Sequence, residues 1–113
     1  MIKIWHNPRC SKSRESLKLL QENSDENIEI REYLKDTPSK DELSEIIKLL
    51  DIHPEKLLRK TESIFKEEFK GKELSEQEWI DAMVKYPKLI ERPIVIKNNK
   101  AVIGRPPSLV LDL

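Results

Sequence analysis

The chain has 113 residues, and 21 lysine and arginine residues balance 21 aspartate and glutamate residues. A chain of this length buries about two thirds of its unfolded surface, so we expect a single domain over residues 1–113. Because there is no excess of positive charge to hold a phosphate backbone, the composition argues against direct nucleic-acid binding.

The sequence carries no signal of a membrane or export segment. It has no run of 18 apolar residues, and residues 1–6 become polar too early for a signal peptide. We therefore expect a cytoplasmic protein that does not insert into a membrane. Cys10 is the only cysteine, so any disulfide chemistry needs a second molecule, and a cysteine-based zinc site is excluded. His6 and His53 also lack the spacing of metal ligands.

The first third of the chain has the pattern of a strand, a helix and a second strand. Apolar residues alternate over residues 2–5, the turn signal Asn7-Pro8 follows, and a helix is predicted over about residues 11–21. Residues 28–30 alternate again and predict a second strand, which such a unit places parallel to the first. Cys10 then lies just beyond the carboxyl end of the first strand, where open α/β sheets usually place their ligands.

Two interpretations of Cys10 are open. A lone cysteine is often a small buried apolar residue. At a helix start, however, the backbone N–H groups and the positive end of the helix dipole stabilise a thiolate, and three cations stand nearby: Arg9, Lys12 and Arg14. Because an inert thiol normally has apolar neighbours, this basic and polar setting favours a reactive thiol.

Two capping boxes predict the main helices in the middle of the chain. Ser39 with Glu42 forms the first box, and apolar residues follow it at the spacing of one buried helix face. Ser75 with Glu78 forms the second box, and its helix is predicted to run until Pro87.

The segment between these two helices is less regular. We expect a short helix over residues 55–58 that carries Arg59 at its end, and a helix or an ordered loop over residues 61–72. Together these helices form an expected insertion over about residues 39–87.

The last quarter of the chain predicts a β-hairpin and a short helix. Residues 94–96 and 101–103 are apolar, and the pair Asn98-Asn99 between them can take the positive φ values that a tight turn requires. Ser108 could cap a final short helix over residues 109–113. The order of βαβ, then helices, then ββα predicts an α/β protein with the thioredoxin-like fold and a helical insertion between its halves.

Arg92 and Arg105 stand out because each directly precedes a proline. Residues before proline favour an extended backbone, so neither arginine should lie in a helix. Arg92 enters one hairpin strand and Arg105 leaves the other, which places both at the same end of the antiparallel pair. Guanidinium groups there could grip a tetrahedral oxyanion beside a thiolate. The alternative is that both are ordinary cations on a solvated surface.

Four stretches in this order carry a resemblance that covers nearly the whole chain: His6-Asn7-Pro8-Arg9-Cys10-Ser11-Lys12-Ser13-Arg14, Leu57-Leu58-Arg59, Leu89-Ile90-Glu91-Arg92-Pro93-Ile94-Val95 and Gly104-Arg105-Pro106. With them the chain resembles the glutathione- and glutaredoxin-dependent arsenate reductases of thioredoxin fold. The resemblance implies that Cys10 is the nucleophile and that three arginines bind the arsenic oxyanion: Arg59, Arg92 and Arg105. It also implies that His6 and Ser13 help to tune the thiol and that Pro93 is cis, with Arg14 as a supporting cation. A packing role for His6 is equally open.

The implied reaction uses no metal and no bound cofactor. The Cys10 thiolate would attack arsenate and form a thiol–arsenic adduct, glutathione as co-substrate would attack that adduct, and glutaredoxin would resolve the mixed disulfide as arsenite leaves. The arginines would attract the oxyanion and keep Cys10 ionised. The implied partners are arsenate or a similar oxyanion, glutathione and glutaredoxin, and we expect a monomer.

Other classes of protein use the same residues differently. The Spx-type regulators share this fold and bind RNA polymerase, but their Cys-x-x-Cys switch cannot form here because Ser13 occupies the second position. Phosphatase-like arsenate reductases need an arginine where this chain has Ser16. A glutathione-dependent thiol reductase or transferase with another substrate stays open, as does a non-enzymatic Spx-like regulator. The loop also departs from the Cys-Gly-Thr-Ser-Arg of the best-known arsenate reductases at Ser11 and Lys12, and Ser11 lacks the backbone freedom of glycine.

Overall fold

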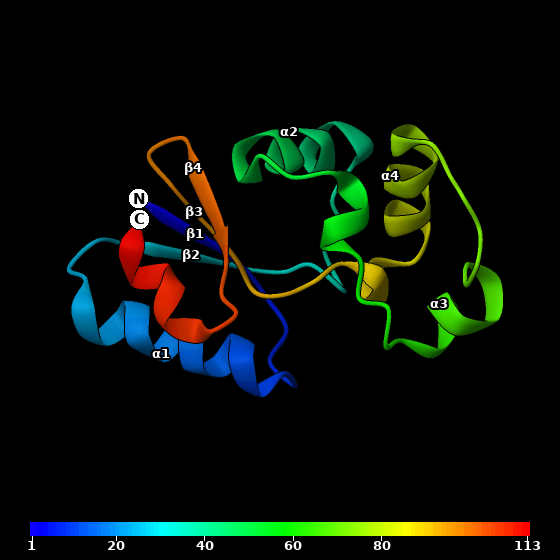
Figure 1. Cartoon of the computed structure of the whole chain (residues 1–113). Helices are drawn as coiled ribbons and strands as arrows, with labels where there is room; N and C mark the ends of the chain where they lie inside the picture. The colour runs from blue at the N-terminus through cyan, green and yellow to red at the C-terminus, as the bar shows by residue number, and fades with distance from the viewer. The chain divides into compact units, whose positions relative to one another are not determined.

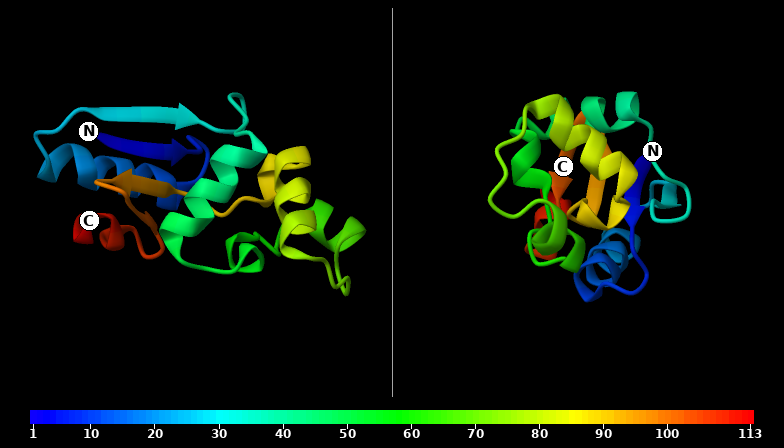
Figure 2. Two further views of the ribbon diagram at one scale, coloured as in Figure 1. Left: turned by 90° about the horizontal axis from the view of Figure 1, so that it is seen from above. Right: turned by 90° about the vertical axis from the view of Figure 1, so that its right-hand side faces the viewer.

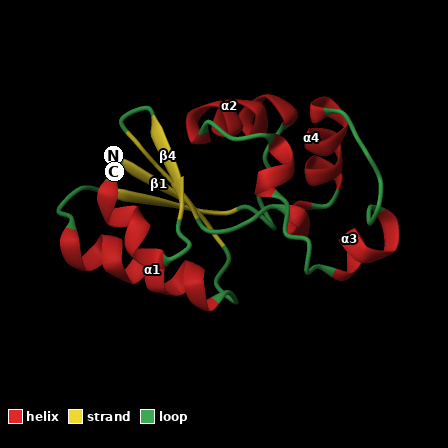
Figure 3. Cartoon of the chain, viewed as in Figure 1, coloured by secondary structure: helices red, strands yellow, loops and turns green.

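The computed structural model describes all 113 residues, which divide into two compact units. The first unit contains residues 1–36 and 92–113, and the second contains residues 37–91. The first unit holds the β-sheet, and the second is built of helices and loops (Figures 1 and 3). The expectation of one domain with an insertion over about residues 39–87 stays a prediction.

A four-stranded sheet forms the centre of the first unit. Its strands are β1 (Ile2–His6), β2 (Ile28–Glu32), β3 (Ile94–Lys97) and β4 (Lys100–Ile103), in the spatial order β2-β1-β3-β4. β1 is parallel to β2 and antiparallel to β3, and β3 pairs antiparallel with β4. The βαβ unit, the hairpin and the thioredoxin-like fold class are therefore confirmed. The hairpin turns at Asn98 and Asn99 with φ angles of 51° and 59°, as its two-residue loop requires.

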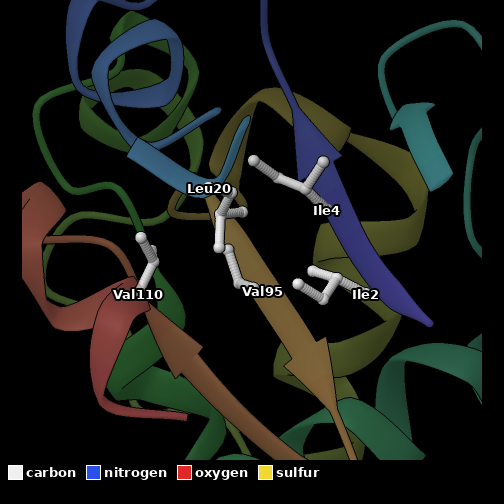
Figure 4. Packing of buried hydrophobic residues seen from close by; sticks show 5 residues of the cluster. All are labelled: Ile2, Ile4, Leu20, Val95 and Val110. Carbon is white, nitrogen blue, oxygen red and sulfur yellow. The ribbon is translucent and has the colours of Figure 1, made fainter. Parts of the chain in front are cut away.

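Two helices cover one face of this sheet. The helix α1 (Ser11–Asn23) and the 3-10 helix η3 (Pro107–Asp112) lie side by side (Figures 1 and 2). The core beneath them consists of side chains that are at most 3% exposed (Figure 4): Ile2, Ile4, Leu20, Val95 and Val110. Full burial of such a side chain stabilises a fold by about 1.5–3 kcal/mol. This packing anchors β1 and α1 on both sides of the loop that carries Cys10.

The second unit is helical. Its elements are α2 (Lys40–Leu50), η1 (Pro54–Leu57), α3 (Ser63–Glu68), α4 (Glu76–Lys85) and η2 (Pro87–Leu89). Both predicted capping boxes are present, and α2 packs against α4. The rings of Phe65 and Phe69 lie 6.3 and 6.0 Å from that of Trp79, so they join α3 to α4. None of the helices combines the length and the apolar character needed to span a bilayer.

Two short helices differ from the sequence prediction. The last helix is a 3-10 helix that begins at Pro107, and Ser108 does not cap it. Proline is favoured at the first position of a helix because its φ angle is preset, which moves the start ahead of the serine. The helix expected over residues 55–58 is likewise a 3-10 helix over Pro54–Leu57, because the His53 side chain accepts a hydrogen bond from the backbone of Glu55 and caps it one residue earlier.

Candidate active site

Cys10 is the N-cap residue of α1 and is half-buried. Its backbone N–H donates to the Asn7 carbonyl at 3.0 Å, and its carbonyl accepts the first helical hydrogen bond from Arg14 at 3.0 Å. The chain therefore makes a tight turn after β1 and enters the helix at the cysteine itself. This places the sulfur beside the first N–H groups of α1, which have no partner within the helix.

A hydrogen-bond network, buried at Ser13 and His6, holds the loop ahead of Cys10. Ser13 Oγ accepts from the backbone N–H of Asn7 at 3.0 Å and lies 2.6 Å from His6 Nδ1. Asn7 Oδ1 accepts from the backbone N–H of Arg9 at 3.1 Å, and Arg14 Nη1 donates to the Pro8 carbonyl at 3.0 Å. The loop is thus tied to both β1 and α1, which fixes the direction of the amides that face the thiol.

The surroundings of His6 favour its neutral form. Burial lowers the pKa of His6, which outweighs the raising effect of Glu32, and Arg14 lowers it further. Because Ser13 Oγ already accepts from Asn7, its hydroxyl proton can be donated to Nδ1 of the neutral imidazole. His6 therefore supports the loop as a neutral hydrogen-bond partner of Ser13.

The two Arg-Pro pairs lie together in the first unit. The peptide bonds before Pro93 and Pro106 are both cis. Arg105 Nε donates to the Arg92 carbonyl at 2.9 Å, so the ends of β3 and β4 are joined as the antiparallel pairing predicted. Arg105 Nη2 also donates to Cys10 Sγ at 3.5 Å. A guanidinium group therefore contacts the thiol directly.

The surroundings of Cys10 favour the thiolate. Burial raises the pKa of the Cys10 thiol and is the largest single effect, but the combined opposing effects win, so the net pKa is lowered. The opposing effects come from the Ser13 amide, from the Arg92 guanidinium as donor and as charge, and from the Lys12 amide. Neither amide makes a capping hydrogen bond of strict geometry to the sulfur, so both act as nearby dipoles.

Arg59 belongs to the second unit, where it follows η1. Its guanidinium forms ion pairs with Glu62 at 3.2 Å and with Glu91 at 3.3 Å. The sequence analysis predicted neither ion pair. Glu91 lies 32 residues from Arg59, so no local pattern indicates that pair, whereas the i+3 spacing of Glu62 could have indicated the other.

The structure gathers most of the residues singled out in the sequence within the first unit: Cys10, His6, Ser13, Arg14, Arg92, Pro93 and Arg105. Their roles in catalysis stay predictions. The sequence analysis identified Asn7-Pro8 as a turn signal, but it did not predict that the side chain and the backbone of Asn7 both hold the loop. No group of three or more histidine, cysteine, aspartate or glutamate side chains is placed to hold a metal ion.

Replacing Ser13 with alanine should slow alkylation of Cys10 at neutral pH. Without the hydroxyl, His6 Nδ1 and the Asn7 N–H lose their common partner at buried positions, and the amides that face the sulfur become less well aimed. The pKa of Cys10 should then rise, which the pH dependence of iodoacetamide alkylation measures. The exposed Ser11 in the same turn offers Ser11→Ala as a matched control with a native profile. An unchanged midpoint for Ser13→Ala would limit Ser13 to packing.

The order of the sheet and the place of Cys10 at the start of α1 put this chain in the thioredoxin-like class of α/β proteins. A family model described as the ArsC family matches residues 5–113. The chain belongs to the ArsC family.

Several relatives are similar over nearly their full length. The chain is 47% identical to the uncharacterized protein YfgD of Escherichia coli K12, covering 99% of this chain and 95% of the relative. It is 42% identical to an arsenate reductase of Haemophilus influenzae, covering 97% and 96%. The solved structure of an arsenate reductase from Vibrio cholerae superposes with a TM-score of 0.92 at 42% identity, covering 98% of this chain and 95% of that one.

Proposed function

We propose that this protein is an oxidoreductase that reduces arsenate to arsenite through the thiolate of Cys10, with glutathione and glutaredoxin as electron donors. The observation that carries the proposal is the half-buried thiol at a helix start, with a lowered pKa and a guanidinium donor 3.5 Å from its sulfur. Relatives named as arsenate reductases at 42% identity support arsenate as the substrate. We also propose that the protein acts in the cytoplasm as a monomer.

The arrangement suits attack on an oxyanion. Arg92 and Arg105 supply fixed positive charge and planar donor groups that match the oxygens of a tetrahedral anion. The same charges hold Cys10 as the thiolate, so the nucleophile and its substrate are stabilised together. Arg59 is proposed as a further oxyanion ligand on the strength of the family resemblance.

The reaction balances with one cysteine and two thiols of the donor system. The Cys10 thiolate forms an S–As bond as one arsenate oxygen leaves as water. The glutathione thiol then attacks the Cys10 sulfur of the adduct: an S–S bond forms, the S–As bond breaks, and its electron pair stays on arsenic, which leaves as arsenite. A glutaredoxin thiol attacks the glutathione sulfur of this Cys10–glutathione disulfide, which releases the Cys10 thiolate and forms a glutaredoxin–glutathione disulfide. The thiols of glutathione and glutaredoxin thus become one disulfide overall, and the two electrons that they give up reduce As(V) to As(III).

The test is arsenate-dependent consumption of NADPH by the protein with glutathione, glutaredoxin and glutathione reductase. The native chain should turn over, and Cys10→Ala should not, provided that circular dichroism confirms its fold. Ser11→Ala is the matched control and should keep native activity, because Ser11 is exposed in the same turn of α1.

Two further arms separate the parts of the proposal. Thioredoxin with thioredoxin reductase replaces the glutathione system in the first arm, and equal turnover there would contradict the proposed donors. The second arm measures the rate of Cys10 alkylation beside arsenate turnover. One outcome is that arsenate produces no turnover while Cys10 is still alkylated rapidly. That result would reject arsenate and favour a thiol reductase or transferase with another substrate.

A further inference from the structure

A cavity of about 220 Å³ lies beside the loop that leads to Cys10. Residues 6–9, from the end of β1 and the following loop, form one part of its lining, and the other part lies at and beyond the end of β2: Glu32, Leu34 and Lys35. Because β1 and β2 are parallel, the cavity lies at the carboxyl ends of both strands, where open α/β sheets usually place their ligands. All of these residues belong to the first unit, which also contains the thiol.

The cavity lies close enough to Cys10 for one ligand to contact both. The Cys10 N–H donates to the Asn7 carbonyl at 3.0 Å, and a turn of this kind brings the Cα atoms of its first and last residues within about 7 Å. Asn7 lines the cavity, is buried, and is held by hydrogen bonds with Arg9 and Ser13. An extended dipeptide spans about 7 Å. A small peptide with one end in the cavity can therefore extend to the Cys10 sulfur.

An acidic and a basic side chain lie side by side in the lining. Glu32 Oε1 and Lys35 Nζ are 3.8 Å apart, which is longer than the about 2.7–2.9 Å of a charge-assisted hydrogen bond. The Lys35 side chain is 84% exposed, so this ion pair is weak and can open. Leu34 adds an exposed apolar side chain. The lining thus suits a ligand with an ammonium group, a carboxylate and methylene groups close together.

The volume limits how much of a ligand can enter. Sites that enclose a whole small molecule usually measure about 300–1,000 Å³. A cavity of about 220 Å³ is smaller, so it fits one end of a small molecule whose remainder lies outside.

We propose that this cavity binds the γ-glutamyl end of glutathione, with Glu32 as the partner of its ammonium group and Lys35 as the partner of its α-carboxylate. The proposal rests on the proposed function in one respect, namely that glutathione is the thiol that attacks the Cys10 adduct. The glutamate of glutathione is joined through its side-chain carboxyl, so its α-amino and α-carboxyl groups are both free. Its methylene groups can pack on Leu34. Arg9 also lines the cavity, and its charge attracts every anionic thiol without distinguishing this end.

The test labels Cys10 with 2,2′-dithiodipyridine and follows displacement of the label by thiols. The incoming thiolate attacks the Cys10 sulfur, a new disulfide forms, and 2-thiopyridone leaves and is measured by its absorbance. γ-Glutamylcysteine and N-acetylcysteine form a matched pair, because both are N-acylated cysteines with the same net charge and only the first has the glutamyl end. Each rate is divided by the rate of the same thiol with free 2,2′-dithiodipyridine, which removes differences in intrinsic reactivity.

The native chain should react roughly three- to tenfold faster with γ-glutamylcysteine than with N-acetylcysteine, the scale of two exposed ion pairs. Glu32→Gln and Lys35→Gln should each reduce this preference towards one, because each removes one partner of the glutamyl end. Glu29→Gln is the matched control, since Glu29 is exposed on β2 outside the lining and its replacement removes the same charge as Glu32→Gln. Both thiols are compared on every variant, so a change in the reactivity of Cys10 itself cancels.

A native preference of one would overturn the proposal, as would a preference that survives both Glu32→Gln and Lys35→Gln. An equal loss in Glu29→Gln would also overturn it, because the overall charge of β2 would then be responsible.

The measurement uses no arsenate, so it distinguishes failure of this proposal from failure of the proposed function. Glutathione-dependent arsenate turnover together with a native preference of one would reject only the cavity as the binding site. A native preference that depends on Glu32 and Lys35, without arsenate turnover, would support the cavity and reject arsenate as the substrate.

Discussion

Replacing Arg92 with glutamine is expected to lower arsenate turnover by about a hundredfold, the scale of losing one preorganised charged donor at a reacting centre. Arg92 acts on Cys10 both as a hydrogen-bond donor and as a charge, and both effects lower the pKa of the thiol. Without them the Ser13 and Lys12 amides are left to oppose burial, which raises that pKa. Less thiolate is then present at neutral pH, and the oxyanion loses one of its proposed ligands.

The decisive measurement is the pH dependence of Cys10 alkylation, recorded beside turnover. The midpoint should move to higher pH in Arg92→Gln, and Arg92→Lys should recover part of the shift because it keeps the charge but not the planar donor group. Arg9→Gln is the charge-matched control, since Arg9 is exposed next to Cys10 and is not among the groups that lower its pKa. Equal midpoint shifts in Arg92→Gln and Arg9→Gln would mean that only the general positive charge matters.

Arg105 contacts the thiol directly. Its Nη2 donates to Cys10 Sγ at 3.5 Å, so its positive charge also favours the thiolate. Its Nε donates to the Arg92 carbonyl at 2.9 Å, which ties the ends of β3 and β4 together. Arg105 therefore links the end of the hairpin to Cys10.

Local sequence signals were sufficient to predict the structure of segments whose own residues determine their conformation. The capping boxes at Ser39 and Ser75 mark the starts of α2 and α4, because the cap and its glutamate lie within one turn. The Asn98-Asn99 pair marks the hairpin turn, because few other residues accept positive φ angles in succession. The helix-start position of Cys10 followed from the βαβ pattern in the same way.

The features that the sequence analysis did not predict depend on contacts between segments that are distant in the sequence. Arg59 binds Glu91, which lies 32 residues away in the sequence, and the sequence around neither residue predicts this pair. The second cis peptide bond, before Pro106, was also missed, although it repeats the Arg-Pro pattern of Pro93. The same limit applies to Gly104, which precedes Arg105 and whose neighbours come from three separate segments of the chain: α1, the loop before β3, and η3.

Gly104→Ala is expected to destabilise the protein by about 3 kcal/mol, the upper end of the usual cost of overpacking a core. A Cβ atom at Gly104 would lie 2.5 Å from Ser16 Oγ, 2.8 Å from Pro93 Cγ and 3.2 Å from Val110 Cγ1. Ser16 and Val110 are buried on α1 and η3, so little room exists for them to yield. The constraint here is the close approach of packed segments, since the φ angle of Gly104 is not one that excludes other residues.

The same substitution should also impair the site. The Gly104 N–H donates to the Pro93 carbonyl at 2.9 Å, and the next residue is Arg105, so a displaced backbone moves the guanidinium that contacts Cys10. Chemical denaturation and alkylation kinetics measure the two effects separately. Ser16→Ala offers a partial rescue, because it removes the nearest clashing atom, a buried hydroxyl without a hydrogen-bond partner. Ser16→Ala alone should be neutral or slightly stabilising, and a Gly104→Ala variant of native stability would show that these segments can separate without cost.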